Sequence, residues 1–269
     1  MQIIKQTLSI MQKVWRFLPF AYYHPYTNMA IDEVILEAYK AGFVPPTFRV
    51  YGWRPAGISI GYFQKAEEIL DISACRRKGI PFVRRISAGQ MVFHSQDVCY
   101  ALVCSKDDLC LSNSVKESFK QISRFLINAY RSLGLETDFF LEKETGNKHS
   151  PFCFAFSREF DIAFQGRKLG GSAQRRKGDV VFQHGSIPLR LKVEKLAPLL
   201  RKGISIESKA LGLEEALGRP ISFNEFARLI TESFKCTFSL RFKTAGLTPR
   251  EKREVRLAVK RYEKAALVK

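Results

Sequence analysis

Apolar residues recur every three or four positions over 114–133, so that Phe119 and Ile122 fall on one face of a predicted amphipathic helix. Ser114 followed by Glu117 is a capping signal for its start, and a glycine directly after the last apolar position marks its end. Comparable start or stop signals predict further helices over 28–41, over 66–78, over 223–235 and from 249 onward.

Runs of β-branched and aromatic residues bounded by turn residues predict strands elsewhere in the chain. The predicted strands cover 47–53, 57–63, 81–86, 91–94, 98–103, 160–164 and 180–183. Helices and strands do not alternate regularly, which favours an α+β fold over a doubly wound parallel sheet. We therefore predict a mixed β-sheet packed by helices, forming one domain over 1–269 with a basic helical C-terminal extension at about 240–269.

The composition is that of a globular protein, since 46% of the residues are hydrophobic and 22 are phenylalanine, enough for a large core. No window approaches the roughly 20 apolar residues of a membrane span. Residues 1–20 lack a continuous apolar block followed by a small-residue cleavage site, which disfavours a signal peptide. These features predict a soluble, cytoplasmic protein.

The six cysteines form no C-x-x-C pair, and none lies at a typical zinc-ligand spacing from a histidine. In a reducing cytoplasm we expect free thiols, most of them buried and unreactive. Cys153 lies between two phenylalanines and by itself indicates a buried thiol. A neighbouring cation would instead favour its thiolate and make it a nucleophile.

The net charge of +18 favours a polyanionic partner, whether nucleic acid, an anionic membrane surface or an acidic protein. Residues 248–269 contribute eight Lys or Arg against three Glu, a net of +5 (8 − 3), although a solvated helical face explains this run most simply. Aromatic residues are not interleaved with the basic ones as a single-strand stacking surface requires. An acidic protein partner is therefore at least as well supported as nucleic acid.

Three segments combine small residues with a cation or a histidine, a composition that lets a ligand approach the backbone closely. Each also has an ordinary explanation: a tight hairpin turn, a glycine-rich turn beside an exposed lysine, or a buried histidine at a strand end. The candidate residues in them are Arg84, Arg85, Ser87, Ala88, Gly89, Gln90 and His94; Lys168, Gly171, Ser172 and Ala173; and His184 and Gly185.

Taken together and in their order, these segments resemble the lipoate–biotin protein ligase family, and within it the cysteine-dependent octanoyltransferases. The resemblance covers roughly 15–189 and is weaker towards the end of the chain. The matching stretches are 28–33, 51–53, 59–64, 84–85, 153–155, 166–168, 171–176 and 183–186.

The resemblance implies a mixed sheet packed by helices, related to the catalytic domain of class II aminoacyl-tRNA synthetases and to biotinyl protein ligases. By position, Cys153 matches the acyl-accepting cysteine and Lys168 the lysine that favours its thiolate. The tunnel for acyl group and donor would be lined by Arg84, Arg85, Ser87, Ala88, Gly89, Gln90, His94, Gly171, Ser172, Ala173, His184 and Gly185.

The activity implied by the resemblance is transfer of an octanoyl or lipoyl group from acyl carrier protein, through a thioester on Cys153, to a lysine of a lipoyl domain or a glycine-cleavage H protein. The donor is already a thioester, so neither ATP nor another cofactor nor a metal is required. Acyl carrier proteins and lipoyl domains are generally acidic, so the positive charge of this chain would attract them. A membrane partner is not expected, and nucleic acid is disfavoured.

Some positions depart from the family pattern. Ala88 stands where the first of two glycines is usual, Gln90 where arginine or glycine is usual, and Ser95 where aspartate commonly follows the histidine. Cys99 and Ala101 replace a threonine and a serine. A methyl group at Ala88 can narrow the tunnel or disfavour a positive φ angle.

Three alternative functions stay open at this point. An ATP-dependent lipoate–protein ligase would activate the free acid as an adenylate and would not need the cysteine. An octanoyl amidotransferase would take the acyl group from an already modified H protein. A non-catalytic basic binding module would bind without any transfer chemistry.

Overall fold

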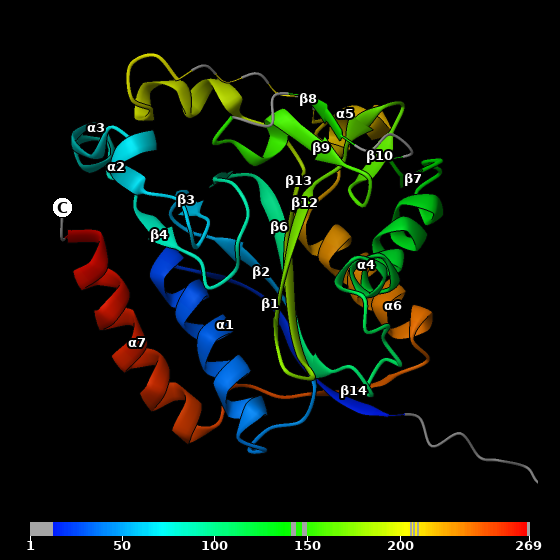
Figure 1. The fold of residues 1–269 in the computed structure, drawn as a ribbon. Helices are drawn as coiled ribbons and strands as arrows, with labels where there is room; N and C mark the ends of the chain where they lie inside the picture. Colours follow the sequence, from blue (N-terminus) through cyan, green and yellow to red (C-terminus); the bar gives the residue numbers. More distant parts are fainter. Residues whose placement is uncertain are drawn as a thin grey trace, which may run out of the picture.

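The computed structural model describes residues 13–140, 144–146, 150–204, 206, 208 and 210–267. Its centre is a six-stranded mixed sheet with the strand order β12-β13-β6-β2-β1-β14 (Figure 1). The three strands at the β14 end are parallel to one another, whereas the others are antiparallel to their neighbours. The strands are β1 (Val14–Tyr23), β2 (Thr47–Trp53), β6 (Asp97–Ser105), β12 (Gly171–Lys177), β13 (Val180–Pro188) and β14 (Arg241–Thr244).

Helices cover both faces of this sheet (Figure 1). The helices α1 (Pro25–Lys40) and α7 (Pro249–Leu267) pack together on one face, and α4 (Val115–Ser132) and α6 (Phe223–Thr237) pack together on the other. The predicted α+β class, a mixed sheet packed by helices, is therefore confirmed.

Alternation of side chains along the central strands explains how one sheet serves two cores. In β6, Tyr100 and Leu102 contact the α4–α6 side, whereas Cys99 and Ala101 contact the α1 side. Successive residues of a strand point to opposite faces, so an uninterrupted apolar run is what a strand covered on both faces requires.

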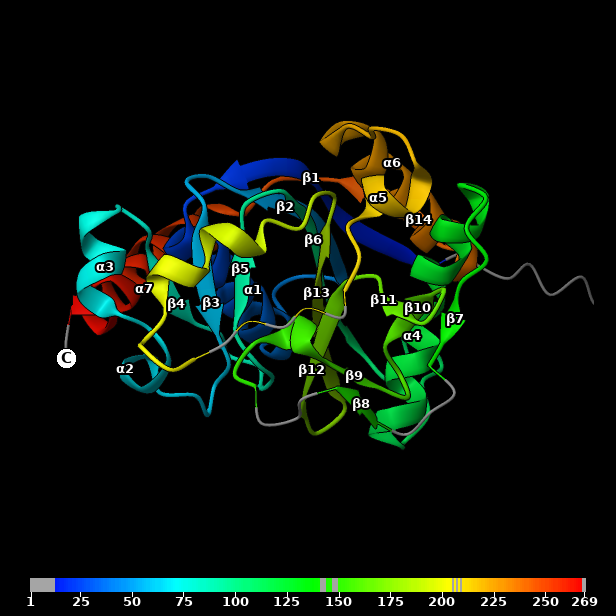
Figure 2. The same cartoon turned by 90° about the horizontal axis from the view of Figure 1, so that it is seen from above.

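Three smaller sheets and several short helices lie beside the central sheet (Figure 2). The sheets have the orders β4-β3-β5, β11-β10-β7 and β8-β9. Their strands are β3 (Gly57–Ile60), β4 (Phe82–Arg84), β5 (Val92–His94), β7 (Asp138–Phe139), β8 (Glu144–Gly146), β9 (Phe156–Arg158), β10 (Ile162–Phe164) and β11 (Arg167–Lys168). The short α-helices are α2 (Ala66–Ile69), α3 (Ile72–Arg77) and α5 (Leu213–Leu217), and 3-10 turns cover Cys153–Ala155, Val193–Lys195 and Ala197–Leu199.

The predicted helix starts agree with the structure where a capping serine is present. The Ser114 side chain accepts a hydrogen bond from the Glu117 amide, and Ser222 accepts one from the Glu225 amide. The single helix predicted over 66–78 is wrong, because the Asp71 side chain caps the Ala74 amide and starts a separate helix there.

Two strand predictions also need correction. The strand predicted over 57–63 ends at Ile60, where the chain turns. The polar stretch 165–179 gives no strand signal, yet it contains β11 and the seven residues of β12. Since β12 is an edge strand that is partly exposed along its length, it lacks the apolar alternation of a half-buried strand.

The C-terminal segment is attached to the rest of the domain at two places. β14 pairs with β1, and α7 contributes Val255 and Ala258 to the core that it shares with α1. Arg16 of β1 forms a buried bidentate ion pair with Glu251 of α7, with both distances 2.7 Å. Within the described part of the chain, no helix has both the length and the apolar character that a membrane crossing requires. Residues 1–12 of the segment considered for a signal peptide lie outside the described residues.

Candidate active site

Cys153 is held at the start of a 3-10 turn by backbone hydrogen bonds to the neighbouring strand segment. The Met91 amide donates to the Pro151 carbonyl at 2.8 Å, and the Cys153 amide donates to the Met91 carbonyl at 2.9 Å. The Gln90 side chain adds a bond from Nε2 to the Ser150 carbonyl at 2.7 Å. Gln90, which departs from the family pattern, therefore fixes the cysteine segment.

Lys168 reaches the same thiol from the β10–β11 hairpin. Gln165 (φ 49°) and Gly166 (φ 74°) both adopt positive φ angles in its turn, the conformation of the tight hairpin turns that glycine favours. This turn pairs Lys168 with Ala163. The lysine is only 3% exposed, and its Nζ lies 3.9 Å from Cys153 Sγ.

A carboxylate accompanies this buried ammonium group. Asp161 Oδ2 lies 2.7 Å from Lys168 Nζ, and both side chains are less than a tenth exposed. A buried cation requires a counter-charge, because the Coulombic attraction offsets part of its lost hydration. Asp161 therefore holds the Lys168 ammonium beside the sulfur, although the sequence analysis did not single out this aspartate.

A pocket of about 50 Å³ opens beside the Cys153 thiol. We call it the central pocket; strands β2, β6, β12 and β13 and the β3–β5 region contribute its walls. It is lined by Met29, Tyr51, Trp53, Ser59, Arg85, Gly89, Gln90, Val92, His94, Cys99, Cys153, Gly171, Ser172, Ala173, His184, Gly185 and Ser186.

Gly171 gives the sulfur its access to this pocket. A Cβ atom built on Gly171 would lie 2.9 Å from Cys153 Sγ, closer than real Cβ atoms approach a neighbour. The glycine is therefore required by the close approach of backbone and thiol, and not by a positive φ angle.

Arg85 supports the turn that forms one wall of the central pocket. Its guanidinium donates to the Ser59 carbonyl at 3.0 Å and to the Gln90 carbonyl at 2.9 Å. Burial lowers the pKa of Arg85 to about 10, so the group stays charged at neutral pH. Gly89, with a φ of 105°, takes the left-handed position of this turn.

His184 is a buried, hydrogen-bonded histidine in the opposite wall. Its Nε2 lies 2.6 Å from Ser87 Oγ, and its Nδ1 lies 3.6 Å from Asp32 Oδ2. Burial lowers the pKa of His184, an effect that the nearby Asp32 only partly opposes. The neutral imidazole thus connects the turn after β4 to α1 through its two partners.

Two residues predicted to line the tunnel lie elsewhere. Arg84, the last residue of β4, is exposed and donates to the Tyr62 carbonyl at 2.9 Å, whereas Arg85 directly after the strand is buried. Ala88 is also exposed, so its methyl group does not narrow the central pocket. Ser87 acts on the pocket indirectly, through His184.

Most of the other predicted residues lie close together in the structure. Arg85, Gly89, Gln90, His94, Gly171, Ser172, Ala173, His184 and Gly185 all border the central pocket with Cys153. Tyr51 and Trp53 form an aromatic wall of this pocket that no sequence motif predicts, because neither side chain carries an obvious chemical signal. A hairpin turn at Gln165-Gly166 pairs Ala163 with Lys168. Recognising this hairpin from the sequence would have placed Asp161, two residues before Ala163, near the lysine.

A mixed sheet between two helical layers, with a half-buried thiol and a buried ammonium beside a pocket, is an arrangement that can support acyl transfer through a thioester. The family model for the lipoyl protein ligase A/B catalytic domain matches residues 24–235, and the chain belongs to this family. The family resemblance inferred from the sequence is confirmed.

Individual relatives cover nearly the whole chain. It is 36% identical over 251 residues to octanoyltransferase LipM of Moorella thermoacetica, covering 89% of this chain and 92% of that protein. It is 34% identical over 268 residues to octanoyltransferase LipM of Geobacillus kaustophilus, covering 94% of this chain and 96% of that protein.

Solved structures confirm the fold at lower sequence identity. The bipartite lipoate protein ligase of Thermoplasma acidophilum superimposes with a TM-score of 0.73 at 19% identity, covering 93% of this chain and 92% of that one. A lipoate-protein ligase A bound with ATP gives a TM-score of 0.69 at 21% identity, covering 93% and 95%.

Proposed function

We propose that this chain is an octanoyltransferase of protein lipoylation that carries the acyl group as a thioester on Cys153. The supporting observation is the placement of a half-buried thiol 3.9 Å from the Lys168 ammonium, at the edge of the central pocket. Near-full-length relatives named octanoyltransferase support the acyl group and the reaction class.

In the first step the Cys153 thiolate attacks the carbonyl carbon of an octanoyl thioester on acyl carrier protein. The carbon–sulfur bond to the carrier breaks, and the carrier thiolate leaves and takes up a proton. The Cys153 amide is already bonded to Met91, so it is not a free donor for the oxyanion. Lys168 favours the attacking thiolate and can donate to the developing negative charge.

In the second step an uncharged lysine amine of the acceptor attacks the Cys153 thioester. An amide forms, the bond to the sulfur breaks, and the thiolate returns to its place beside Lys168. A lysine amine has a reference pKa of about 10.4, so it must lose a proton as the acceptor docks. The buried wall of Tyr51, Trp53 and Met29 supplies an apolar surface for the acyl chain.

The partners in this proposal are acyl carrier protein as the donor and a lipoyl domain or a glycine-cleavage H protein as the acceptor. The net charge of +18 complements acidic carrier domains and would raise their encounter rate. One of the superimposable structures was determined for a ligase together with its E2 lipoyl domain, an acceptor of this kind.

The first experiment is to measure the intact mass of the purified protein after incubation with octanoyl–acyl carrier protein without ATP. We expect an octanoyl adduct that hydroxylamine removes and that is absent from Cys153→Ala. Cys110→Ser is the matched control, because Cys110 is an exposed thiol away from the central pocket.

Two further incubations separate the alternatives. An adduct formed only from octanoylated H protein would identify an amidotransferase. Acceptor modification that requires ATP and free acid, and that persists in Cys153→Ala, would identify a ligase and would overturn the proposal. Salt-dependent nucleic-acid binding without any transfer would instead identify a binding module.

A further inference from the structure

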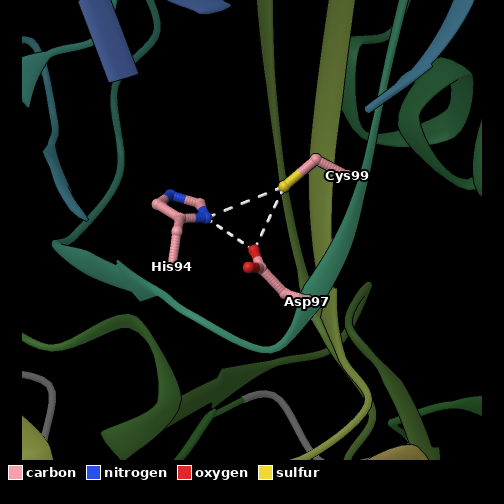
Figure 3. A group of neighbouring side chains, drawn as sticks. All are labelled: His94, Asp97 and Cys99. Carbon is pink, nitrogen blue, oxygen red and sulfur yellow. Dashed lines mark hydrogen bonds and ion pairs between the residues drawn. The ribbon is translucent and has the colours of Figure 1, made fainter. Parts of the chain in front are cut away.

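Three potential metal ligands converge where β5 ends and β6 begins, in the wall of the central pocket. Figure 3 shows the side chains of His94, Asp97 and Cys99 pointing toward one another. All three are buried, and His94 and Cys99 border the pocket. Only the two-residue link Ser95-Gln96 separates the strands, so the backbone itself brings the three side chains together.

The hydrogen bonds of Asp97 are distributed unevenly between its two carboxylate oxygens. Oδ2 is 2.6 Å from His94 Nδ1, 3.1 Å from Cys99 Sγ and 2.6 Å from Ser186 Oγ. Oδ1 is also buried but has no hydrogen-bond partner among the described residues. A buried carboxylate oxygen without a partner is costly, so this oxygen indicates a missing ligand.

We propose that His94, Asp97 and Cys99 form a binding site for a divalent cation of borderline softness, such as Zn²⁺. Imidazole, carboxylate and thiolate are the ligand types that zinc takes in proteins. The two negative charges of Asp97 and the Cys99 thiolate would balance the charge of the ion inside a buried site. On binding, the thiol and the imidazole Nδ1 each release any proton that they carry to solvent.

The distances among the donor atoms are near those that such an ion needs. His94 Nδ1 lies 3.7 Å from Cys99 Sγ, and tetrahedral zinc keeps its nitrogen, oxygen and sulfur donors about 3.3–3.8 Å apart. The Nδ1–Oδ2 contact is shorter because it is a hydrogen bond. Rotation of the carboxylate would separate these two atoms and turn Oδ1 toward the ion.

The surroundings can hold the histidine in the orientation that a metal requires. The Trp53 ring stacks on His94 at a centroid distance of 3.9 Å and an angle of 2°. His94 Nε2 lies 2.8 Å from Ser59 Oγ, so with a metal on Nδ1 it can donate to that hydroxyl. Metal-bound histidines commonly use their second nitrogen in this way.

The site is separate from the proposed transfer chemistry, because neither Cys153 nor Lys168 belongs to it. Three protein donors leave a fourth position for water or for a ligand group in the pocket. The histidine and the cysteine are five positions apart with an aspartate between them, which is why the usual cysteine–histidine spacings give no signal.

The test is a titration of the metal-free, reduced protein with Co²⁺, a spectroscopic substitute for Zn²⁺. The background variant carries Cys110→Ser, Cys153→Ser and Cys236→Ser, so that no exposed thiol and no active-site thiol can bind the ion. We expect one equivalent of Co²⁺ to give a sulfur-to-cobalt charge-transfer band and the visible bands of a tetrahedral site. Zn²⁺ should displace these bands.

Substitutions then assign the ligands. Cys99→Thr should abolish the charge-transfer band and weaken Zn²⁺ binding by at least about 100-fold, and Asp97→Asn should weaken it without removing the band. Cys104→Ser, a buried thiol on the same strand but in the other core, should change neither. Absence of the band in the background variant, or its persistence in Cys99→Thr, would overturn the proposal. Because Cys153 is absent throughout, the result does not depend on acyl transfer.

Discussion

The carboxylate of Asp161 lies 2.7 Å from the ammonium of Lys168, and the same ammonium lies 3.9 Å from the Cys153 sulfur. The contact with Asp161 holds the ammonium group in place, and the contact with the sulfur lets its positive charge act on the Cys153 thiolate. A lysine side chain has four rotatable carbon–carbon bonds, so a second anchor is needed to hold its charge at one atom. Asp161 provides that anchor inside the domain.

Asp161→Asn should therefore slow the reaction, and it should also lower the free energy of unfolding because it leaves the buried Lys168 ammonium without its counter-charge. The amide still accepts a hydrogen bond but loses its negative charge, so the ammonium is held less firmly. We expect alkylation of Cys153 by iodoacetamide and octanoyl transfer each to slow by about 10-fold, a change of about 1.4 kcal/mol in the barrier. Asp138→Asn, an exposed carboxylate on the neighbouring β7, should leave both rates unchanged.

Lys168→Met should have a larger effect than Asp161→Asn, because it removes the cation itself. The methionine keeps the length and apolar stem of the side chain. We expect Cys153 alkylation and acyl-enzyme formation to slow by about 100-fold, because the attacking sulfur loses the neighbouring positive charge. Unchanged alkylation in this variant would show that the lysine does not act on the sulfur.

Gly171→Ala tests the close approach of backbone and thiol. The added methyl group would lie 2.9 Å from Cys153 Sγ, so the sulfur must rotate away or the strand must shift. Acyl-enzyme formation should fall by at least about 100-fold, because small misplacements of reacting groups are costly. Gly246→Ala has open space around its new methyl group and should retain full activity and stability.

Much of this arrangement follows from local sequence signals, and the remainder depends on pairing between distant segments. The capping residues Ser114 and Ser222 define helix starts because their hydrogen bonds are local. The contact of Asp161 with Lys168 depends on which residues pair in the β10–β11 hairpin. The outward direction of Arg84 depends on which side of the short strand β4 faces the pocket. Such features are decided by tertiary packing, which composition and spacing do not encode directly.

The pH dependence of stability should reveal the buried His184. Burial lowers its pKa in the folded protein, whereas the unfolded chain has the ordinary value of about 6.5. Below pH 6.5 the unfolded state takes up a proton that the folded state does not. The free energy of unfolding should therefore fall as the pH decreases from 6.5 toward the folded pKa, by at most about 1.4 kcal/mol per unit.

Urea unfolding curves at several pH values between 5 and 8 measure this effect. His184→Gln should reduce the slope over the window below pH 6.5, because the titrating group is gone. His24→Gln is the comparison: burial also lowers the pKa of His24, but this residue is exposed at the start of α1, so the slope should fall less than in His184→Gln. An unchanged slope in His184→Gln would show that this histidine does not couple protonation to folding.

A buried ion pair links the C-terminal helix α7 to strand β1. Arg16 and Glu251 form two hydrogen bonds of 2.7 Å, and their side chains are 5% and 2% exposed. Glu251→Ala leaves the arginine buried without its counter-charge and also removes a bond to the Thr248 amide. Breaking one partner of a buried pair typically costs about 3–5 kcal/mol, so we expect a loss of that size in urea unfolding.

The contrasting pair Glu33–Arg261 joins α1 to α7 near the surface, with the arginine 61% and the glutamate 29% exposed. Since exposed pairs contribute about 1 kcal/mol or less, Glu33→Gln should leave stability nearly unchanged. Hydrogen exchange should show faster exchange throughout α7 in Glu251→Ala but not in Glu33→Gln. If exchange in α7 is equally slow in both variants, the helix is held by its apolar contacts with α1 and the buried pair contributes little.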